Sequence, residues 1–164
     1  MARTKQSSPI MEKRKMMDRR TFGLTLAASG AVPAAQAAGD TLEVNKRTVL
    51  AFYDAALNRS NFDEAAAYFG PQYIQHNPMI KDGIDGFRSF LQDLKKQFPD
   101  LRSEIKRVFA EGDFVILHVH AKRQPSELGL AIVDIFRLDH GKIVEHWDVR
   151  QPLVEASANN NGMF

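Results

Sequence analysis

An aspartate stands among apolar residues in a segment that alternates like a β-strand. In Ile132-Val133-Asp134-Ile135-Phe136, Asp134 is the single charged side chain. Burial among apolar groups disfavours the charged form of a carboxyl group, and a carboxyl group tuned in this way can act as an acid or base near neutral pH. Asp134 is therefore the first candidate for a catalytic residue. The alternative is a structural role, in which the aspartate pairs with an arginine or caps a backbone group.

Two histidines provide a second candidate group. His118 and His120 are two positions apart in the apolar segment 114–122, so on a strand they share a face. Histidine can donate or relay a proton in catalysis, so His120 is a candidate catalytic residue and His118 a candidate substrate contact. The pair could instead bind a divalent ion, because Gly112 precedes His118 as in the opening of a cupin metal motif. The rest of that motif is missing from the sequence, so we predict no metal at these histidines.

The aspartate lies in a predicted hairpin. Residues 132–138 and 143–149 are rich in β-branched and aromatic side chains, as strands are. The turn between them contains Gly141 where a tight hairpin needs a positive φ. The sequence therefore predicts two antiparallel strands joined at His140-Gly141.

The register of this hairpin decides which side chains surround Asp134. Pairing across the turn and counting back places Trp147 opposite Asp134. Since side chains alternate along a strand, Phe136 and Trp147 should share the face of Asp134 and wall it off from water. His146 and Asp148 should then lie on the other face, with Arg137, as an ion-pair cluster or a substrate site.

The remaining pattern predicts helices ahead of a sheet. Apolar residues recur at helical spacing in 41–58 and again before Pro99, and a shorter helix should run from Asn61 to Phe69. Strands are expected over 101–110 and 114–122, followed by the hairpin. This order predicts an α+β domain with three N-terminal helices packed on a curved, four-stranded, mostly antiparallel sheet.

The first 38 residues have the features of an export signal. A basic region ends in Arg19-Arg20-Thr21-Phe22, a short apolar run follows, and Pro33 to Ala38 offers small residues for cleavage. The arginine pair resembles a twin-arginine signal, although Asp18 and Gly23 depart from its usual pattern. We expect residues 1–38 to be a signal peptide read by the twin-arginine export machinery and the product to be periplasmic or secreted.

The charge of the rest of the chain limits its partners. Residues 1–38 contain seven basic and two acidic residues; subtracting them from the 22 basic and 20 acidic residues of the chain leaves 15 and 18, a net charge of −3. A mildly acidic domain argues against nucleic-acid binding. Beyond the leader no apolar run is long enough for a membrane span. With no cysteine, a packed core must hold one domain over residues 39–152, and residues 153–164 should form a flexible tail.

These features together resemble the SnoaL-like polyketide cyclases of the nuclear transport factor 2-like superfamily. The resemblance covers about residues 41–152. It rests on the order of elements, the piece Tyr73-Ile74-Gln75-His76-Asn77-Pro78, the turn Glu111-Gly112-Asp113 before a strand with histidines, and the last hairpin. It implies a cone-shaped α+β barrel with a pocket between helices and sheet, and a homodimer.

The resemblance also implies a mechanism and the residues that perform it. The cyclases carry out aldol condensation without a cofactor, using an aspartate equivalent to Asp134 and a histidine on the preceding strand, here His120. His76 would lie at the pocket mouth, and Asn77 is a possible donor to the substrate. Tyr53 and Tyr73 could bind a substrate or be core aromatics. We therefore expect acid/base chemistry, of the aldol, isomerase or lyase type, on a small apolar carbonyl compound. The alternative is a non-catalytic ligand-binding or accessory domain.

Overall fold

The computed structural model describes residues 34–164, with side chains from residue 38 onward. Most of the predicted signal peptide, including its arginine pair, lies outside the described residues. The elements follow the chain as α1 (Ala34–Tyr53), the π-helical turn η1 (Asp54–Asn58), α2 (Phe62–Ala66), β1 (Phe69–Gln75), α3 (Gly83–Gln97), β2 (Arg102–Glu111), β3 (Phe114–Lys122), β4 (Leu130–Asp139) and β5 (Lys142–Pro152). The α+β class is confirmed, with three α-helices in the described part of the chain.

The helices form where their sequences carry an apolar stripe and an end signal. Val49, Phe52 and Tyr53 are buried on one side of α1. Asn61 caps α2, since its side-chain oxygen accepts the backbone N–H of Glu64 at 3.2 Å. None of the helices in residues 34–164 combines the length and the apolar character needed to cross a membrane.

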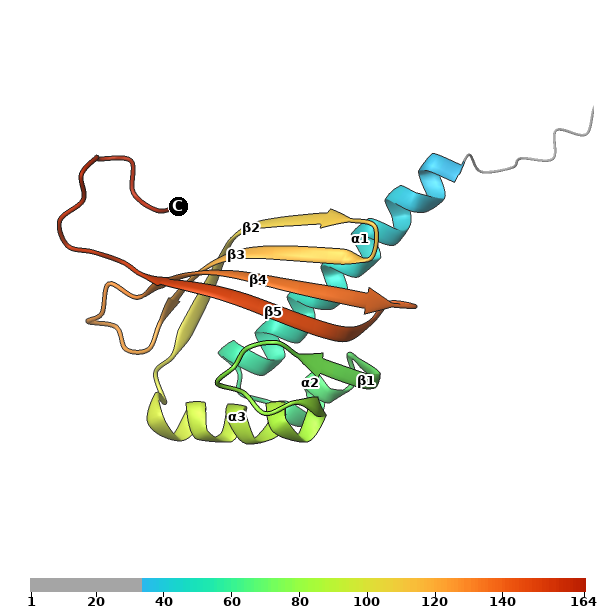
Figure 1. Ribbon diagram of the computed structural model, residues 1–164, viewed down its shortest axis with the longest axis horizontal. Helices are drawn as coiled ribbons and strands as arrows, with labels where there is room; N and C mark the ends of the chain where they lie inside the picture. Colours follow the sequence, from blue (N-terminus) through green and yellow to red (C-terminus); the bar gives the residue numbers. More distant parts are fainter. Residues whose placement is uncertain (1–33) are drawn as a thin grey trace, which may run out of the picture. The chain divides into compact units, whose positions relative to one another are not determined.

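The sheet has five strands in the order β1-β5-β4-β3-β2, one more than predicted (Figure 1). The added strand β1 contains the segment around Tyr73 and pairs in parallel with β5, whereas all other neighbours are antiparallel. The prediction that the second helix reaches Phe69 is therefore wrong, because α2 ends at Ala66. An edge strand tolerates Pro71, which has no N–H to donate, so the proline did not exclude a strand here.

The hairpin β4–β5 has the predicted turn but a different register beyond it. His140 and Gly141 both have positive φ, 49° and 72°, and Leu138 pairs with Ile143 as expected. A bulge then leaves Val144 without a partner on β4, and every later pair is displaced by one residue. Asp134 consequently lies opposite Asp148, and the prediction that Trp147 faces it is wrong.

One core joins the helices to the inner face of the sheet. The ring of Phe52 in α1 lies 5.5 Å from that of Phe87 in α3 and 5.8 Å from that of Phe136 in β4, measured between centroids. Val115, Leu117 and Val119 of β3 are fully buried beneath them. Because side chains alternate, His118 and His120 point to the outer face. There the C-terminal Phe164 folds back over them, with ring centroids 5.1 and 4.8 Å away.

Candidate functional site

A pocket of about 340 Å³ lies between the helices and the inner face of the sheet. Its walls are mainly aromatic and aliphatic and include Phe52, Phe87 and Phe136. Its polar groups at the deep end come from α1, β1 and the hairpin: Tyr53, Tyr73, Asp134, His146 and Asp148. A concave, mostly apolar cavity with a few convergent polar groups is the usual form of a small-molecule site.

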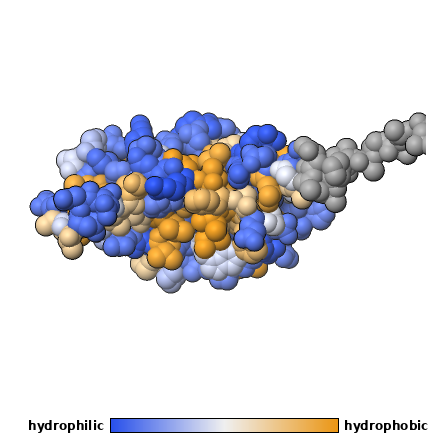
Figure 2. All heavy atoms as spheres, turned by 90° about the horizontal axis from the view of Figure 1, so that it is seen from above, coloured by the Kyte–Doolittle hydropathy of each residue, from blue (hydrophilic) through white to orange (hydrophobic). Residues whose placement is uncertain are grey.

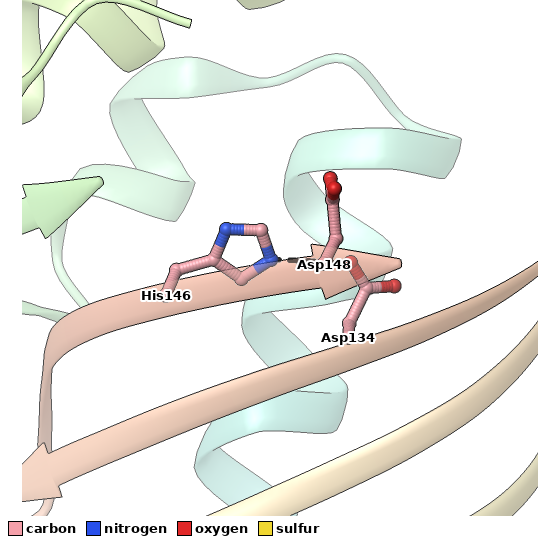
Figure 3. Close-up of side chains that lie close together, drawn as sticks. All are labelled: Asp134, His146 and Asp148. Carbon is pink, nitrogen blue, oxygen red and sulfur yellow. Dashed lines mark hydrogen bonds and ion pairs between the residues drawn. The ribbon is translucent and has the colours of Figure 1, made fainter. Parts of the chain in front are cut away.

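Asp134 is the buried acid of this pocket, as the sequence predicted. It is 5 % exposed, and both of its carboxylate oxygens have partners. Oδ2 accepts the hydroxyl of Tyr53 at 3.1 Å, and Oδ1 lies 3.1 Å from Nε2 of His146. Figure 3 shows the imidazole of β5 turned toward the carboxyl group of β4. The structural alternative of an arginine partner does not apply to Asp134, since no arginine lies within 4.0 Å of it among the described residues.

The neighbours of His146 fix where its protons are. Its Nδ1 lies 3.1 Å from Oε1 of Gln75. That amide atom must be oxygen, because it also accepts the backbone N–H of Asn77 at 2.9 Å. Nδ1 of His146 therefore carries a hydrogen. The contact between Nε2 and Asp134 is then a hydrogen bond only if the two groups share one further proton, as imidazolium and carboxylate or as imidazole and carboxylic acid.

Tyr73 offers the pocket a free donor. Its hydroxyl oxygen accepts a hydrogen bond from Nε2 of Gln75 at 2.8 Å, and its own hydrogen has no acceptor among residues 34–164. Burial, aided by the negative charge of Asp134, raises the pKa of Tyr73 above 10.0. Burial and Asp134 likewise raise the pKa of Tyr53 well above 10.0. Both hydroxyls therefore stay protonated at physiological pH, and the hydrogen of Tyr73 can go to a ligand oxygen.

Asp148 is the second carboxylate of the site, directly opposite Asp134 in the sheet. Its Oδ2 accepts a hydrogen bond from Nδ2 of Asn77 at 2.6 Å. Asn77 is 3 % exposed, and its Oδ1 accepts the backbone N–H of Met79. Asn77 thus supports Asp148 from behind and does not line the pocket, contrary to its predicted contact with substrate.

The histidines predicted from β3 lie outside this pocket. Nε2 of His120 is 2.7 Å from the carbonyl oxygen of Leu128, and Nδ1 of His118 is 3.0 Å from the guanidinium of Arg107. Both are on the outer face of the sheet, so the structure contradicts the role of His120 as the partner of Asp134 and the contact of His118 with substrate. The physical reason is strand alternation, since buried Val119 occupies the inner face between them.

Two further predicted contacts also belong to the outer face. The rings of His76 and Trp147 stack with centroids 4.6 Å apart, and Nε2 of His76 lies 2.8 Å from a carboxylate oxygen of Glu145. Of the predicted apolar wall only Phe136 lines the pocket. The bulge at Val144 moved Trp147 out and brought His146 in.

Three side chains of the same site lie close enough together to be possible ligands of one metal ion. One ligand atom each from Asp134, His146 and Asp148 lie within 4.8 Å of one another. Both nitrogens of His146 are already engaged, with Gln75 and with Asp134. His118 and His120, which the sequence offered as alternative metal ligands, do not belong to this group.

His146 was predicted for the outer face and lies beside Asp134 instead, and Gln75 was not among the predicted site residues. Ile143-Val144 breaks the alternation of the last strand, and this pair of adjacent apolar residues was the signal for a bulge. The segment of Gln75 was predicted to be a short extended piece, but its pairing with β5, which brings Gln75 to His146, was not predicted. In β1, Tyr73 and Gln75 share the inner face with buried Asn77 just beyond the strand, while His76 points outward.

Comparison with known proteins identifies the family of the chain. The family model for the SnoaL-like domain matches residues 49–146. A search of curated proteins finds none that matches. Among solved structures, AclR from Streptomyces galilaeus, provisionally assigned as a hydroxylase, has 25% identity and a TM-score of 0.57, over 67% of this chain and 90% of AclR.

Two other solved structures have the same fold. A provisionally assigned polyketide cyclase from Bacillus cereus has 18% identity and a TM-score of 0.58, over 65% of this chain and 74% of that one. A cystatin-fold protein from Novosphingobium aromaticivorans has 22% identity and a TM-score of 0.56, over 65% and 97%. The family match covers more than half of the chain, and the chain therefore belongs to the SnoaL-like domain family.

Proposed function

We propose that the pocket catalyses proton transfer at a carbon next to the carbonyl group of a small, largely apolar compound. The observation that carries the proposal is the contact of buried Asp134 with His146 and Tyr53 at the deep end of an apolar cavity. A carboxylate held in this way is a suitable general base, and an imidazole that shares its proton can store or return it.

The proposed step transfers one proton from carbon to Asp134 and moves one electron pair to oxygen. The carboxylate of Asp134 takes the proton, the C–H bond breaks, and its electron pair moves to the carbonyl oxygen. The resulting enolate oxygen accepts a hydrogen bond from Tyr73, whose hydroxyl hydrogen has no other acceptor among the described residues. Return of the proton to another carbon completes an isomerisation. Attack of the enolate carbon on a second carbonyl completes an aldol step, with the proton going to the new alkoxide.

The test is hydrogen exchange, which does not depend on knowing the final product. The purified protein is incubated in D₂O with a panel of small aryl ketones and β-diketones, and NMR follows loss of the proton next to the carbonyl. Asp134→Asn keeps the shape of the side chain but cannot act as a base, so exchange should fall by about 100- to 10,000-fold. Exchange that persists unchanged in Asp134→Asn would overturn the proposal.

A ligand-binding role without catalysis is the second candidate, because most of the pocket lining is apolar. Under that reading Asp134→Asn weakens the binding of a ligand and no substrate is turned over. Mass spectrometry of compounds that co-purify with the protein separates the two roles. A compound with an acidic C–H next to a carbonyl favours the enzyme, whereas an inert lipid favours the carrier.

We also propose that the protein is exported by the twin-arginine machinery. The support is the sequence of residues 1–38, with Arg19-Arg20 before an apolar run. A reporter fused behind residues 1–38 should reach the periplasm. Replacing both arginines by lysine keeps the charge and should abolish export. A reporter that still reaches the periplasm would contradict the proposal.

A homodimer is proposed from the outer face of the sheet. Val133 and Val149 lie opposite each other there and are 38 % and 69 % exposed. Phe114, further along the same face at the start of β3, is 40 % exposed, and its ring centroid lies 6.3 Å from that of Trp147. Figure 2 shows apolar residues gathered across the middle of the view from above. Exposed apolar clusters of this kind often mark interfaces. Light scattering should give a dimer mass, and Val149→Glu should shift it toward the monomer; a monomeric wild type would contradict this.

A further inference from the structure

The open end of the pocket carries two arginines that the proposed chemistry does not use. Arg150 lies two residues beyond Asp148 on β5 and lines the pocket with a side chain that is 40 % exposed. Arg123 also lines the pocket and directly follows β3, so both arginines come from strand ends that are remote from the β4–β5 turn. At the deep end Asp134 and His146 are 5 % and 7 % exposed. The cavity therefore runs from a buried acid/base pair to a solvent-accessible pair of cations.

Both guanidinium groups have donors to spare. The Cζ atom of Arg123 lies 5.2 Å from the ring centroid of Phe98, and no carboxylate lies within 4.0 Å of its guanidinium in the described part of the chain. The nearest carboxylate to Arg150 is that of Asp148, at 3.9 Å from Nε, which is too long for a hydrogen bond. By contrast, Arg137 on the outer face is bonded to Glu145 at 2.6 Å. The two arginines at the pocket can thus still bind an anion.

The charge at the deep end decides which way round a charged ligand enters. This end holds two carboxyl groups, those of Asp134 and Asp148, against one imidazole, that of His146, so the balance of charge there is negative. An anionic group placed there would be repelled and would lose its hydration. Next to two partly exposed guanidiniums it is attracted and keeps contact with water. Any acidic group of the ligand therefore belongs at the open end.

We propose that the ligand has an apolar body and one anionic head, a carboxylate or a similar oxyanion, held by Arg123 and Arg150. The body fills the aromatic part of the pocket and presents its carbonyl end to Asp134. The inference rests on the proposed function for the reacting end, and it adds the class of substrate: a carbonyl compound that also carries an acidic group.

A pair of fluorescent probes tests the head group without knowledge of the natural ligand. 1-Anilinonaphthalene-8-sulfonate and N-phenyl-1-naphthylamine share one apolar body, and only the first carries an anion. The wild type should bind the sulfonate more tightly. Arg123→Gln and Arg150→Gln should each weaken sulfonate binding about tenfold and change binding of the neutral amine less than about twofold. Raising the salt concentration should reduce the difference between the probes.

Two kinds of control separate charge from shape. Arg123→Lys and Arg150→Lys keep the cation and should retain most of the preference for the sulfonate. Arg47→Gln removes an exposed arginine of α1 that does not line the pocket and should change neither affinity. Equal weakening of both probes by the glutamine variants, or no weakening, overturns the inference. It is also overturned if the wild type shows no preference for the sulfonate or binds neither probe.

Failure of the anionic-head inference and failure of the proposed function give different results. Asp134→Asn should abolish deuterium exchange and leave the arginine-dependent binding of the sulfonate in place. If exchange requires Asp134 but sulfonate binding does not depend on the arginines, only the inference of an anionic head is overturned. Binding of the sulfonate that depends on the arginines, without any exchange, supports the anionic head and overturns the enzyme.

Discussion

His146 of β5 and Asp134 of β4 face each other across 3.1 Å on the inner side of the sheet, although a regular hairpin would put them on opposite sides. The one-residue bulge at Val144 produces this relationship. It turns an outer-face histidine into the partner of a buried acid and sends Trp147 outward to stack on His76. The candidate site is therefore a consequence of a local irregularity in one strand.

Histidine substitutions should separate the inner from the outer face. His146→Gln removes the group that shares a proton with Asp134 and should lower the rate of deuterium exchange by about 100-fold or more. His118→Gln and His120→Gln change the outer face and should leave that rate within about twofold. The measurement is the exchange rate for each variant under identical conditions. A larger loss for His120→Gln than for His146→Gln would contradict the site described here.

The tautomer of His146 should depend on Gln75. Because Oε1 of Gln75 accepts from Nδ1, long-range ¹H–¹⁵N NMR of the wild type should show a protonated Nδ1. Gln75→Leu removes that acceptor, and the imidazole should then be free to carry its hydrogen on Nε2. Exchange activity should fall by about 10- to 100-fold, as when a group that orients a histidine is lost. An unprotonated Nδ1 in the wild type would refute the proton assignment.

Gly70 should be needed for the bulge. A Cβ added at this position would lie 2.7 Å from Cγ1 of Val144, so Gly70→Ala must displace the bulged strand. We expect a loss of about 1–3 kcal/mol in the free energy of unfolding, measured by urea denaturation. Val144→Ala removes the obstructing methyl group.

The double variant provides the control for this prediction. The combined variant, Gly70→Ala with Val144→Ala, should lose less unfolding free energy than the sum of the losses in the two single variants. The difference, which is the coupling energy, should be about 1 kcal/mol or more. Additive effects would mean that the two residues do not meet at the bulge.

The buried tyrosines should make the fold sensitive to alkali. The pKa of Tyr53 and that of Tyr73 are raised by folding, so each contributes stability that is complete below pH 10.0 and is lost as pH rises above it. Each should steepen the fall of unfolding free energy by about 1.4 kcal/mol per pH unit. Tyr53→Phe and Tyr73→Phe should each make the slope shallower between about pH 10 and 11. An unchanged slope in both variants would contradict the assignment.

Much of the architecture follows from local sequence signals. The cap at Asn61, the turn at His140-Gly141 and the β3 strand over 114–122 formed as predicted, because each depends on residues close together in the chain. The burial of Asp134 was likewise predictable, since an acid among apolar residues on a strand is visible without coordinates. The α+β class followed from the order of these elements.

The partners of that acid were decided by tertiary structure. Alternation along β3 predicted that His118 and His120 share one face of the sheet. Only the inward packing of Val119 showed that this face points away from the core. The register around Asp134 depends on where Val144 bulges against Gly70, and β1 exists because it pairs with an edge of β5 distant in sequence. Sequence alone therefore determined which residue is the acid, whereas contacts between distant strands determined that His146, Gln75 and Tyr73 surround it.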